Sequence, residues 1–543
     1  MQLTRAPAQR RGNPARRTVR STTIAAPVGG YDAKNPLASM PPLAAVQLKN
    51  WFPQPGYVEV RRGHKQHAFG LSDSPVETLA VWQGPTSSKL KAIAGGDIYD
   101  VSVSGTASVS HSASFASNRW QSTNHTTAAG QFLFLCNGVD APLHYNGTTW
   151  TAPTITNITA SNAVQAVSHK KRLWMVLADS TKAAYLATDA VAGSATEFQF
   201  GSLFSRGGYL NALATWTRDG GSGADDYLVG ISSQGQAAVY QGTDPSSAST
   251  WSLVGVFDVP RPIGRRCFTK LGGDLLLITL EGAFPLSQLL SVDQSQVGRV
   301  AITDSIAPVF NTAARSYASN FGWEICVYPK GTRLFVNVPT AEDSAAIQYV
   351  QNTITGAWCE YDAHNAICWT IFNDRPYFGG EGGVVYEADT GSADIDSPVV
   401  ATGQCAYSAF GTAQLKRFSM IRPLITTSNT NRPSVGISTD FVETSNLSAL
   451  QTANVVGAAM WDVSSWDAAS WASSVAEVSD WANASALGSF GSIKFQARTG
   501  ISVGGGAWGI SRWGQSLWGS EGRSDETMRI QGFVLLYEPG EFL

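Results

Sequence analysis

The stretch that decides the fold of this chain is YLVGISSQGQAAVYQGTDPSSASTW, from Tyr227 to Trp251. An apolar run is followed by a turn with glycine, a second run that contains a tyrosine, another turn and a tryptophan. Two further stretches repeat this order: FLFLCNGVDAPLHYNGTTW (Phe132 to Trp150) and LFVNVPTAEDSAAIQYVQNTITGAW (Leu334 to Trp358). Short apolar runs separated by turn residues are typical of β-strands joined in hairpins.

The spacing of these stretches predicts a repeat. Their tyrosines, Tyr145, Tyr240 and Tyr349, are 95 and 109 residues apart, and one less complete copy lies in each interval. The unit is therefore about fifty residues, the period of propeller blades. A blade is too narrow to bury its own faces, so blades stack around an axis, and we expect Tyr and Trp to fill the space between them. The copies indicate five to seven blades, although two stacked β-sandwiches would give a similar pattern.

The composition supports an all-β protein. Of 543 residues, 43% are hydrophobic and only 15% charged, with 53 Gly and 24 Pro, which favours short strands and tight turns over charged helices. We predict a β-propeller-like repeat domain with accessory β domains formed by the N- and C-terminal segments. The expected divisions are a flexible basic arm (1–30), an extended connector or platform segment (31–75), the β-propeller (76–400) and a Trp-rich C-terminal β domain (401–543).

Within the last division, AFGTAQLKRFSMIRPLITTSNTNRPSVGISTDF predicts a hairpin of two strands, and GFVLLYEPGEFL predicts a closing strand. Two triplets of tryptophan lie between them at five-residue spacing, which places them on no single face of a helix or strand. We expect them in turns and irregular loops, as core plugs or, alternatively, as sugar-stacking platforms. The triplets are Trp461, Trp466 and Trp471, and Trp508, Trp513 and Trp518.

The N-terminal arm is the one strongly basic segment. Six arginines precede the first acidic residue, Asp32, so that the net charge of −3 conceals an acidic remainder. Such an arm either contacts a partner or DNA, or serves as a solubilising tail. No apolar segment of a secretory signal follows it, and no run is long enough to insert into a membrane. The candidate contact residues are Arg5, Arg10, Arg11, Arg16, Arg17 and Arg20.

No motif predicts a catalytic, cofactor or metal site. The six cysteines form no C-x-x-C pair, which fits buried thiols and assembly in a reducing cytoplasm. The seven histidines lack zinc spacing. Four carboxylates would in principle supply a glycosidase pair, but the sequence does not set their separation. The loop RDGGSGADDY lacks EF-hand spacing and GGGAWG at Gly504 lacks a following helix, so both are expected to be turns. The residues considered are Glu281, Glu360, Asp362 and Glu381, and Asp219, Asp225 and Asp226.

Several motifs, taken in order, resemble a known family. LAAVQLKNWFPQPGYVEVRRGHK, NTITGAW, LKRFSMIRPLITT, STDF and GFVLLYEPG are similar to segments of the tail nozzle, or tail tubular, proteins of short-tailed bacteriophages (podoviruses), which are related to phage DNA-stabilisation proteins. The resemblance runs from about Asn35 to Leu543, while the basic arm and the tryptophan spacing have no counterpart in it.

The resemblance implies a non-enzymatic structural protein of the virion tail. Its expected state is a homo-hexameric ring below the portal and adaptor ring, in contact with tail fibre or spike proteins and assembled in the host bacterial cytoplasm. The ring would retain genomic DNA and then channel it during ejection. Two alternatives stay open: a tail-tip protein that binds a host receptor or glycan, which solvent-exposed tryptophans would favour, and a polysaccharide-degrading enzyme, which requires two carboxylates about 5–10 Å apart in a cleft.

Overall fold

The computed structural model describes residues 19–219, 224–291, 298–427, 432–450, 476–478, 480–500 and 527–540. Within these ranges nearly all regular structure is β-strand, and the α-helices are α1 (Leu286–Leu289) and α2 (Ala307–Tyr317). This confirms the predicted all-β class. None of the described helices combines the length and the apolar character needed to cross a bilayer.

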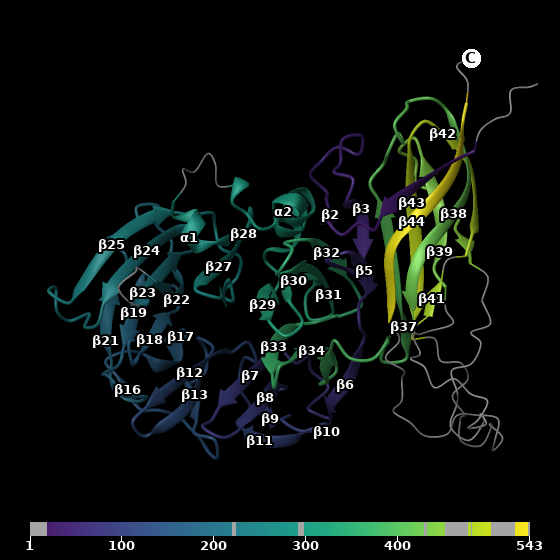
Figure 1. The fold of residues 1–543 in the computed structure, drawn as a ribbon. Helices are drawn as coiled ribbons and strands as arrows, with labels where there is room; N and C mark the ends of the chain where they lie inside the picture. The colour runs from purple at the N-terminus through teal and green to yellow at the C-terminus, as the bar shows by residue number, and fades with distance from the viewer. Residues whose placement is uncertain are drawn as a thin grey trace, which may run out of the picture.

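Seven blades, counted over the described residues, follow one another in chain order (Figure 1). Blades 1 to 5 are separate small sheets, whereas blades 6 and 7 belong to one larger sheet that continues into strands of the terminal segments. Within each blade neighbouring strands pair antiparallel, and in blades 1 to 6 they follow the sequence order from the inside outward. Blade 1 contains β7 (Thr78–Gln83), β8 (Ser88–Ala94), β9 (Asp97–Asp100) and β11 (Ser108–Ser112); blade 2 contains β12 (Gln121–Thr127), β13 (Gly130–Cys136), β14 (Leu143–Tyr145) and β15 (Trp150–Thr151); blade 3 contains β17 (Ala163–His169), β18 (Arg172–Leu177), β19 (Lys182–Tyr185) and β21 (Thr196–Gln199).

The second half of the ring is built in the same way. Blade 4 contains β22 (Leu210–Asp219), β23 (Ala224–Ser232), β24 (Gln236–Gly242) and β25 (Trp251–Asp258); blade 5 contains β26 (Phe268–Leu271), β27 (Asp274–Thr279) and β28 (Gly282–Pro285); blade 6 contains β29 (Glu324–Tyr328), β30 (Arg333–Ala341), β31 (Ala345–Asn352) and β32 (Trp358–Tyr361); blade 7 contains β33 (Cys368–Phe372), β34 (Arg375–Gly379), β35 (Val385–Ala388) and β6 (His64–Phe69).

The ring of blades is closed. Neighbouring blades contact each other through their inner strands, from β7 and β12 around to β33, which packs back against β7. The outer strand of blade 7, β6, comes from the N-terminal segment and pairs antiparallel with β35, with Ala68 opposite Val385. Strand β6 lies before residue 76, so the ring begins earlier in the chain than the expected division places it. Chain segments more than 300 residues apart thus complete one blade.

The tyrosine and tryptophan pattern has a direct structural meaning. Tyr240 lies on β24, the third strand of blade 4, and stacks on Trp251 at the start of the fourth strand, with ring centroids 5.4 Å apart. Trp251 also stacks on Trp174 of blade 3, at 5.7 Å. Tyr145 of blade 2 likewise meets Trp82 of blade 1, at 5.9 Å. The complete copies are blades 2, 4 and 6. The rings of blades 2 and 4 fill the space between blades, as expected, whereas Tyr349 of blade 6 meets Phe310 of α2, with ring centroids 6.3 Å apart.

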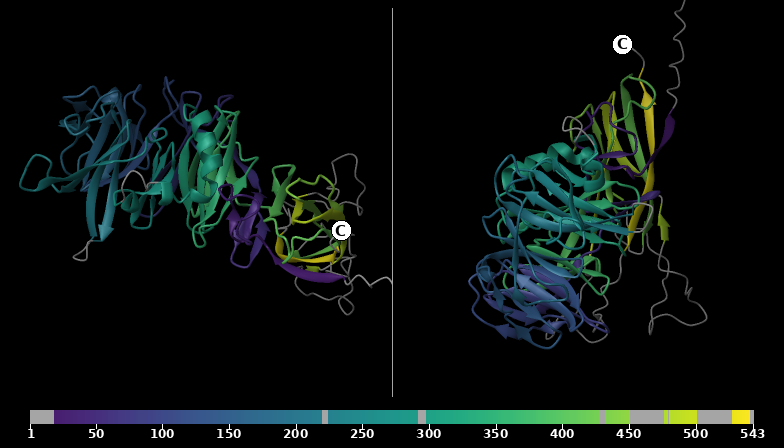
Figure 2. Two further views of the ribbon diagram at one scale, coloured as in Figure 1. Left: turned by 90° about the horizontal axis from the view of Figure 1, so that it is seen from above. Right: turned by 90° about the vertical axis from the view of Figure 1, so that its left-hand side faces the viewer.

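The terminal segments form a β-sandwich beside the propeller (Figure 1, right, and Figure 2). One sheet contains β1 (Arg20–Ala25), β4 (Trp51–Gln54), β5 (Tyr57–Val60), β38 (Lys416–Thr427), β41 (Ala476–Val478), β42 (Ala482–Gly488) and β44 (Met528–Pro539). The facing strands are β2 (Gly30–Tyr31), β3 (Ala44–Lys49), β37 (Ser397–Cys405), β39 (Ser434–Thr439), β40 (Ser448–Ala449) and β43 (Gly491–Thr499). The predicted closing strand is β44, the partner of both β1 and β38.

The sandwich core joins the two ends of the chain. Trp51 from the N-terminal segment is fully buried and meets Phe495 at 5.3 Å, and Phe495 meets Phe533 on β44 at 5.2 Å. The predicted hairpin of residues 409–441 is wrong. Its strands, β38 and β39, pair with different partners in the two facing sheets, because alternating apolar residues fit a strand of either sheet equally well.

Candidate functional site

Among the described residues, two groups of charged side chains are considered as functional sites: one lies between the propeller and the sandwich, and the other lies on the propeller axis. The first is centred on Arg61, which follows β5 and is 2% exposed. Its guanidinium donates to both carboxylate oxygens of Asp394, at 2.9 and 2.6 Å, and to Oδ1 of Asn50 at 2.8 Å. It also donates to the backbone oxygen of Asp362 at 2.8 Å. We call Arg61 and its partners Asp394, His64 and His364 the Arg61 cluster.

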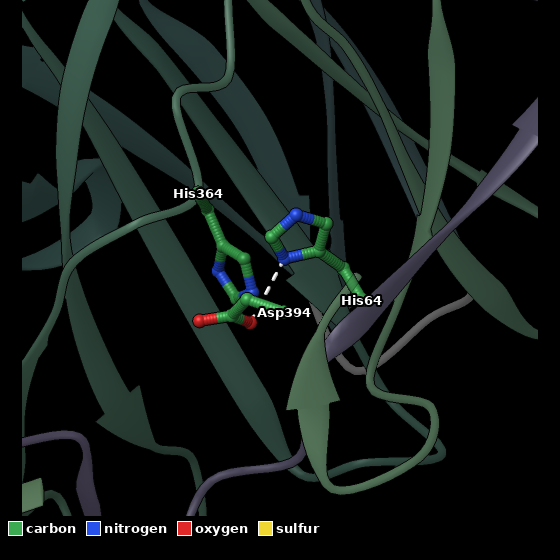
Figure 3. Close-up of side chains that lie close together, drawn as sticks. All are labelled: His64, His364 and Asp394. Carbon is green, nitrogen blue, oxygen red and sulfur yellow. Dashed lines mark ion pairs between the residues drawn. The ribbon is translucent and has the colours of Figure 1, made fainter. Parts of the chain in front are cut away.

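Figure 3 shows the two histidines of this cluster beside the carboxylate. Nδ1 of His64 lies 2.9 Å from Oδ1 of Asp394, and Nε2 of His364 lies 3.2 Å from the Arg61 guanidinium. Burial acts to raise the pKa of Asp394, but His64 and Arg61 outweigh it and hold the pKa well below its ordinary value. Burial, followed by the Arg61 charge, lowers the pKa of His364 well below its ordinary value.

Ligand atoms of His64, His364 and Asp394 lie within 4.8 Å of one another, a spacing that would suit a metal ion. However, the Arg61 guanidinium contacts both Asp394 and His364, and so already supplies the positive charge that a metal would bring. A divalent cation among these groups would be repelled by it at short range. The residues therefore fit an ion-pair cluster that fastens β6 to the sandwich, and they do not fit a metal centre.

The second site is a cavity of about 210 Å³ on the propeller axis. Its walls come from the inner strands of blades 1, 2, 3, 5 and 6, and only a position at the centre of the ring touches so many blades. Most lining residues stand at or just before the first residue of an inner strand, because these strands enter the ring from the same face. The lining residues are Thr78, Leu79, Trp120, Gln121, Ser122, Gln165, Arg265, Arg266, Phe268, Glu324 and Ile325.

Arg266 crosses the axis. From the segment before β26 in blade 5 it donates to the backbone oxygens of Glu77 and Trp120, at 3.1 and 3.0 Å, on the opposite side of the ring. Its guanidinium also lies 3.6 Å from the Glu324 carboxylate of blade 6. Burial raises the pKa of Glu324, and the positive charge of Arg266 opposes this effect. The axis of one propeller is thus closed to any large molecule.

A second arginine reinforces this closure. Arg119 forms ion pairs with Glu77, with Glu342 at 2.8 Å and with Asp343 at 3.3 Å. The Phe321 ring lies between Arg119 and Arg266, with the two guanidinium carbons 4.4 and 5.0 Å from its centroid. Blades 1, 2, 5 and 6 are therefore tied together around the axis by charge as well as by packing.

The carboxylates considered in the sequence lie far from this axial cavity. Glu281 and Glu381 line two different cavities. Glu360 and Asp362 share the single Lys49 ammonium, at 3.6 and 2.8 Å, so both are engaged in an ion pair with the same cation. Burial raises the pKa of Glu360, and this ion pair with Lys49 counteracts it. These positions do not form the open pair across a cleft that a glycosidase requires.

The remaining candidates fall in several places. Asp226 accepts a hydrogen bond from Thr217 at 2.8 Å and lies 3.5 Å from the Lys170 ammonium. Of the six arginines of the arm, only Arg20 is described, at the start of β1, where the described part of the arm pairs with β44 of the sandwich. The other arm arginines, Gly504 and the six tryptophans of the two triplets lie outside the described residues.

Sequence reasoning missed the axial arginines. The signal was the pair Arg265 and Arg266 directly before an apolar strand, in RPIGRRCF, together with Arg119 before β12. Basic residues at the entry of several repeats point to the axis once the repeat itself is recognised.

The closed ring and the attached sandwich define a β-propeller protein. No family model and no curated protein matches the chain. Among solved structures, the chain is similar to the WD40 β-propeller domain of Doa1 (10% identity, TM-score 0.37, covering 60% of this chain and 96% of that one). It is also similar to YCF48 bound to a D1 peptide (10% identity, TM-score 0.36, covering 65% of this chain and 99% of that one). A third similar structure is the computationally designed Ika8 protein (10% identity, TM-score 0.34, covering 60% of this chain and 99% of that one).

Proposed function

We propose that this β-propeller protein is a structural component of the tail of a short-tailed bacteriophage, and that it forms the distal hexameric nozzle ring. The observation that carries the proposal is that exposed apolar side chains occur at both ends of the molecule, in addition to those on blades 1, 2 and 6. At one end, Leu253 and Val254 are 41% and 52% exposed on β25. At the other end lies the sandwich (Figure 1), which exposes Val442 (70%) and Leu487 (60%).

Apolar surfaces on two different sides suit a ring, because each subunit in a ring uses one surface to contact the next and another to contact the previous one. Strand β25 is well suited to such a contact. It is the last strand of its sheet, and among the described residues no strand pairs with its outer edge. An apolar edge strand left in water is a liability that a neighbouring subunit would remove.

A ring also explains how a DNA path is compatible with a closed propeller axis. The axial cavity is far too small for a duplex, so the channel must run between copies of the chain. The part of the chain after the basic arm is acidic, and an acidic wall does not attract phosphates and would let DNA slide. In this proposal the basic arm docks on the adaptor ring or touches DNA. Deletion of residues 1–20 that leaves tail assembly and DNA retention unchanged would exclude that role for the arm.

The test uses two single variants, each of which introduces a lysine at one end of the molecule. Leu253→Lys on β25 and Leu487→Lys on the sandwich should each prevent assembly, because both contacts occur in every subunit interface. Val139→Lys is the matched control, since Val139 is 58% exposed in a turn of blade 2, away from both ends. Light scattering should give a ring for the wild type and the control and monomers for the two variants. Monomers for the wild type, alone and with adaptor rings, would contradict the proposal.

A second candidate is the receptor- or glycan-binding propeller of a tail tip, and a cleft beside blade 7 favours it. The cleft, of about 270 Å³, combines the half-buried Tyr386 ring with polar residues that include Asn365 and Ser397. An aromatic face next to amide and hydroxyl groups suits a sugar ring. Binding of a host glycan that is lost in Tyr386→Ser, with ring formation absent, would favour this candidate over the nozzle.

A further inference from the structure

The axial cavity holds a positive charge for which the described residues supply no carboxylate partner. Arg265 lines the cavity next to Arg266 and stacks on Tyr209, with the guanidinium carbon 5.4 Å from the ring centroid. Its one protein hydrogen bond among the described residues is a long one, to the backbone oxygen of Asn211 at 3.4 Å. Among those residues, no ion pair involves Arg265, so most of its N–H donors lack a protein acceptor.

Neutral donors stand in the same wall. The Gln121 amide and the Ser122 hydroxyl line the cavity, and in the described part of the chain neither side chain has a hydrogen-bond partner. By contrast, the other lining amide, Gln165, donates to the backbone oxygen of Leu213 at 3.2 Å and accepts from its backbone N–H at 2.7 Å. A guanidinium with one long hydrogen bond, and an amide and a hydroxyl without a protein acceptor in the described ranges, therefore line one small volume.

We propose that this cavity binds a carboxylate. A guanidinium offers two parallel N–H groups that match the two oxygens of a carboxylate. The Glu324 carboxylate in the same wall repels any anion, and it repels a phosphate dianion more strongly than a singly charged group. The wall therefore favours a singly charged group. A cavity of about 210 Å³ accommodates a small organic acid or an acidic side chain that projects from a partner protein. The inference does not depend on the ring proposal, since a monomer would carry the same site.

The site is tested by titrating the full chain with propionate, with its neutral amide propionamide, with inorganic phosphate and with a short end-blocked peptide that carries a single Asp, using calorimetry at low salt. We expect saturable binding of the carboxylates only. Binding of both propionate and the peptide identifies a site that accepts a free acid, and binding of the peptide alone identifies one built for a partner's side chain. Tighter binding of phosphate, or no saturable binding of either carboxylate, would overturn the proposal.

Variants locate the binding. Arg265→Gln should weaken carboxylate binding at least tenfold, because a charge-assisted pair is lost, and its unchanged melting temperature would show that the fold is intact. Lys330→Gln is the control, since it removes one exposed positive charge from the turn after β29, away from the cavity. Gln121→Leu removes a lining donor without changing charge, and should weaken binding to a smaller extent. Equal losses in the Arg265 and Lys330 variants would indicate unspecific attraction and would contradict the assignment.

Discussion

Replacement of Arg61 by methionine tests how the propeller is fastened to the sandwich. Arg61 and Asp394 are 2% and 8% exposed, and removal of one partner of a buried pair leaves the other as an uncompensated charge. Such a loss costs about 3–5 kcal/mol, a large share of the roughly 5–15 kcal/mol by which a typical protein is stable. Arg61→Met also leaves the backbone oxygens of Arg62 and Asp362 without this donor.

The assay is urea unfolding followed by tryptophan fluorescence, together with hydrogen exchange of β6. The variant should unfold at lower urea, and the amides of residues 64–69 should lose protection first, because the Arg61 cluster holds the start of β6. The matched control is Arg172→Met: Arg172 pairs at 3.3 Å with a more exposed Asp244, and such pairs are worth about 0–1 kcal/mol.

A double variant distinguishes charge from packing. Arg61→Met with Asp394→Leu should regain much of the lost stability, since replacement of a whole buried ion pair by apolar residues is often neutral. The reasoning is refuted if Arg61→Met unfolds as the Arg172→Met control does, or if the double variant is no more stable than the single one.

Three further predictions concern other parts of the protein. Burial lowers the pKa of His169 to about 4 in the folded protein. As the pH drops, the unfolded chain therefore takes up this proton before the folded protein does. At 1.36 kcal/mol per pKa unit, the free energy of unfolding should fall by up to about 3 kcal/mol between about pH 6.5 and about pH 4. Urea midpoints across this range should show the fall, and His169→Gln should reduce it. Burial raises the pKa of Cys267 and of Cys405 to about 12, so these thiols should resist iodoacetamide until the chain unfolds, as intact mass spectra before and after urea would reveal. Ala68→Asp on β6 should open blade 7, because it places an unpaired carboxylate in a fully buried position. Phe69→Asp is the control, since the neighbouring Phe69 is 43% exposed and its replacement should leave the blade closed. Limited proteolysis should cleave the first variant faster than the second.

The propeller could be predicted because its signal is local. Each Tyr and Trp pair belongs to one hairpin, so the third and fourth strands of blades 2, 4 and 6 are visible as a short motif. Blade 1 carries no such pair and escaped notice. The closure by β6 could not be predicted, since its partner β35 lies more than 300 residues away and no periodicity connects them.

Prediction of the two sites required knowledge of the topology to a greater degree than prediction of the propeller did. Arg61, His364 and Asp394 are widely separated in sequence, and only the meeting of β6 with the sandwich brings them together. Likewise, Arg119, Arg266 and Glu324 belong to different blades, and each alone is an ordinary charged residue before a strand. Their common position follows from the ring, which places the entry of every inner strand at the axis.

Native mass spectrometry of the full chain, alone and mixed with portal and adaptor rings, tests the central functional claim most directly. One chain has a mass of 57.7 kDa. The account predicts a species of six copies, formed either by the chain alone or on the adaptor ring. A strict monomer that ignores the tail rings, and that binds a host glycan instead, would contradict it.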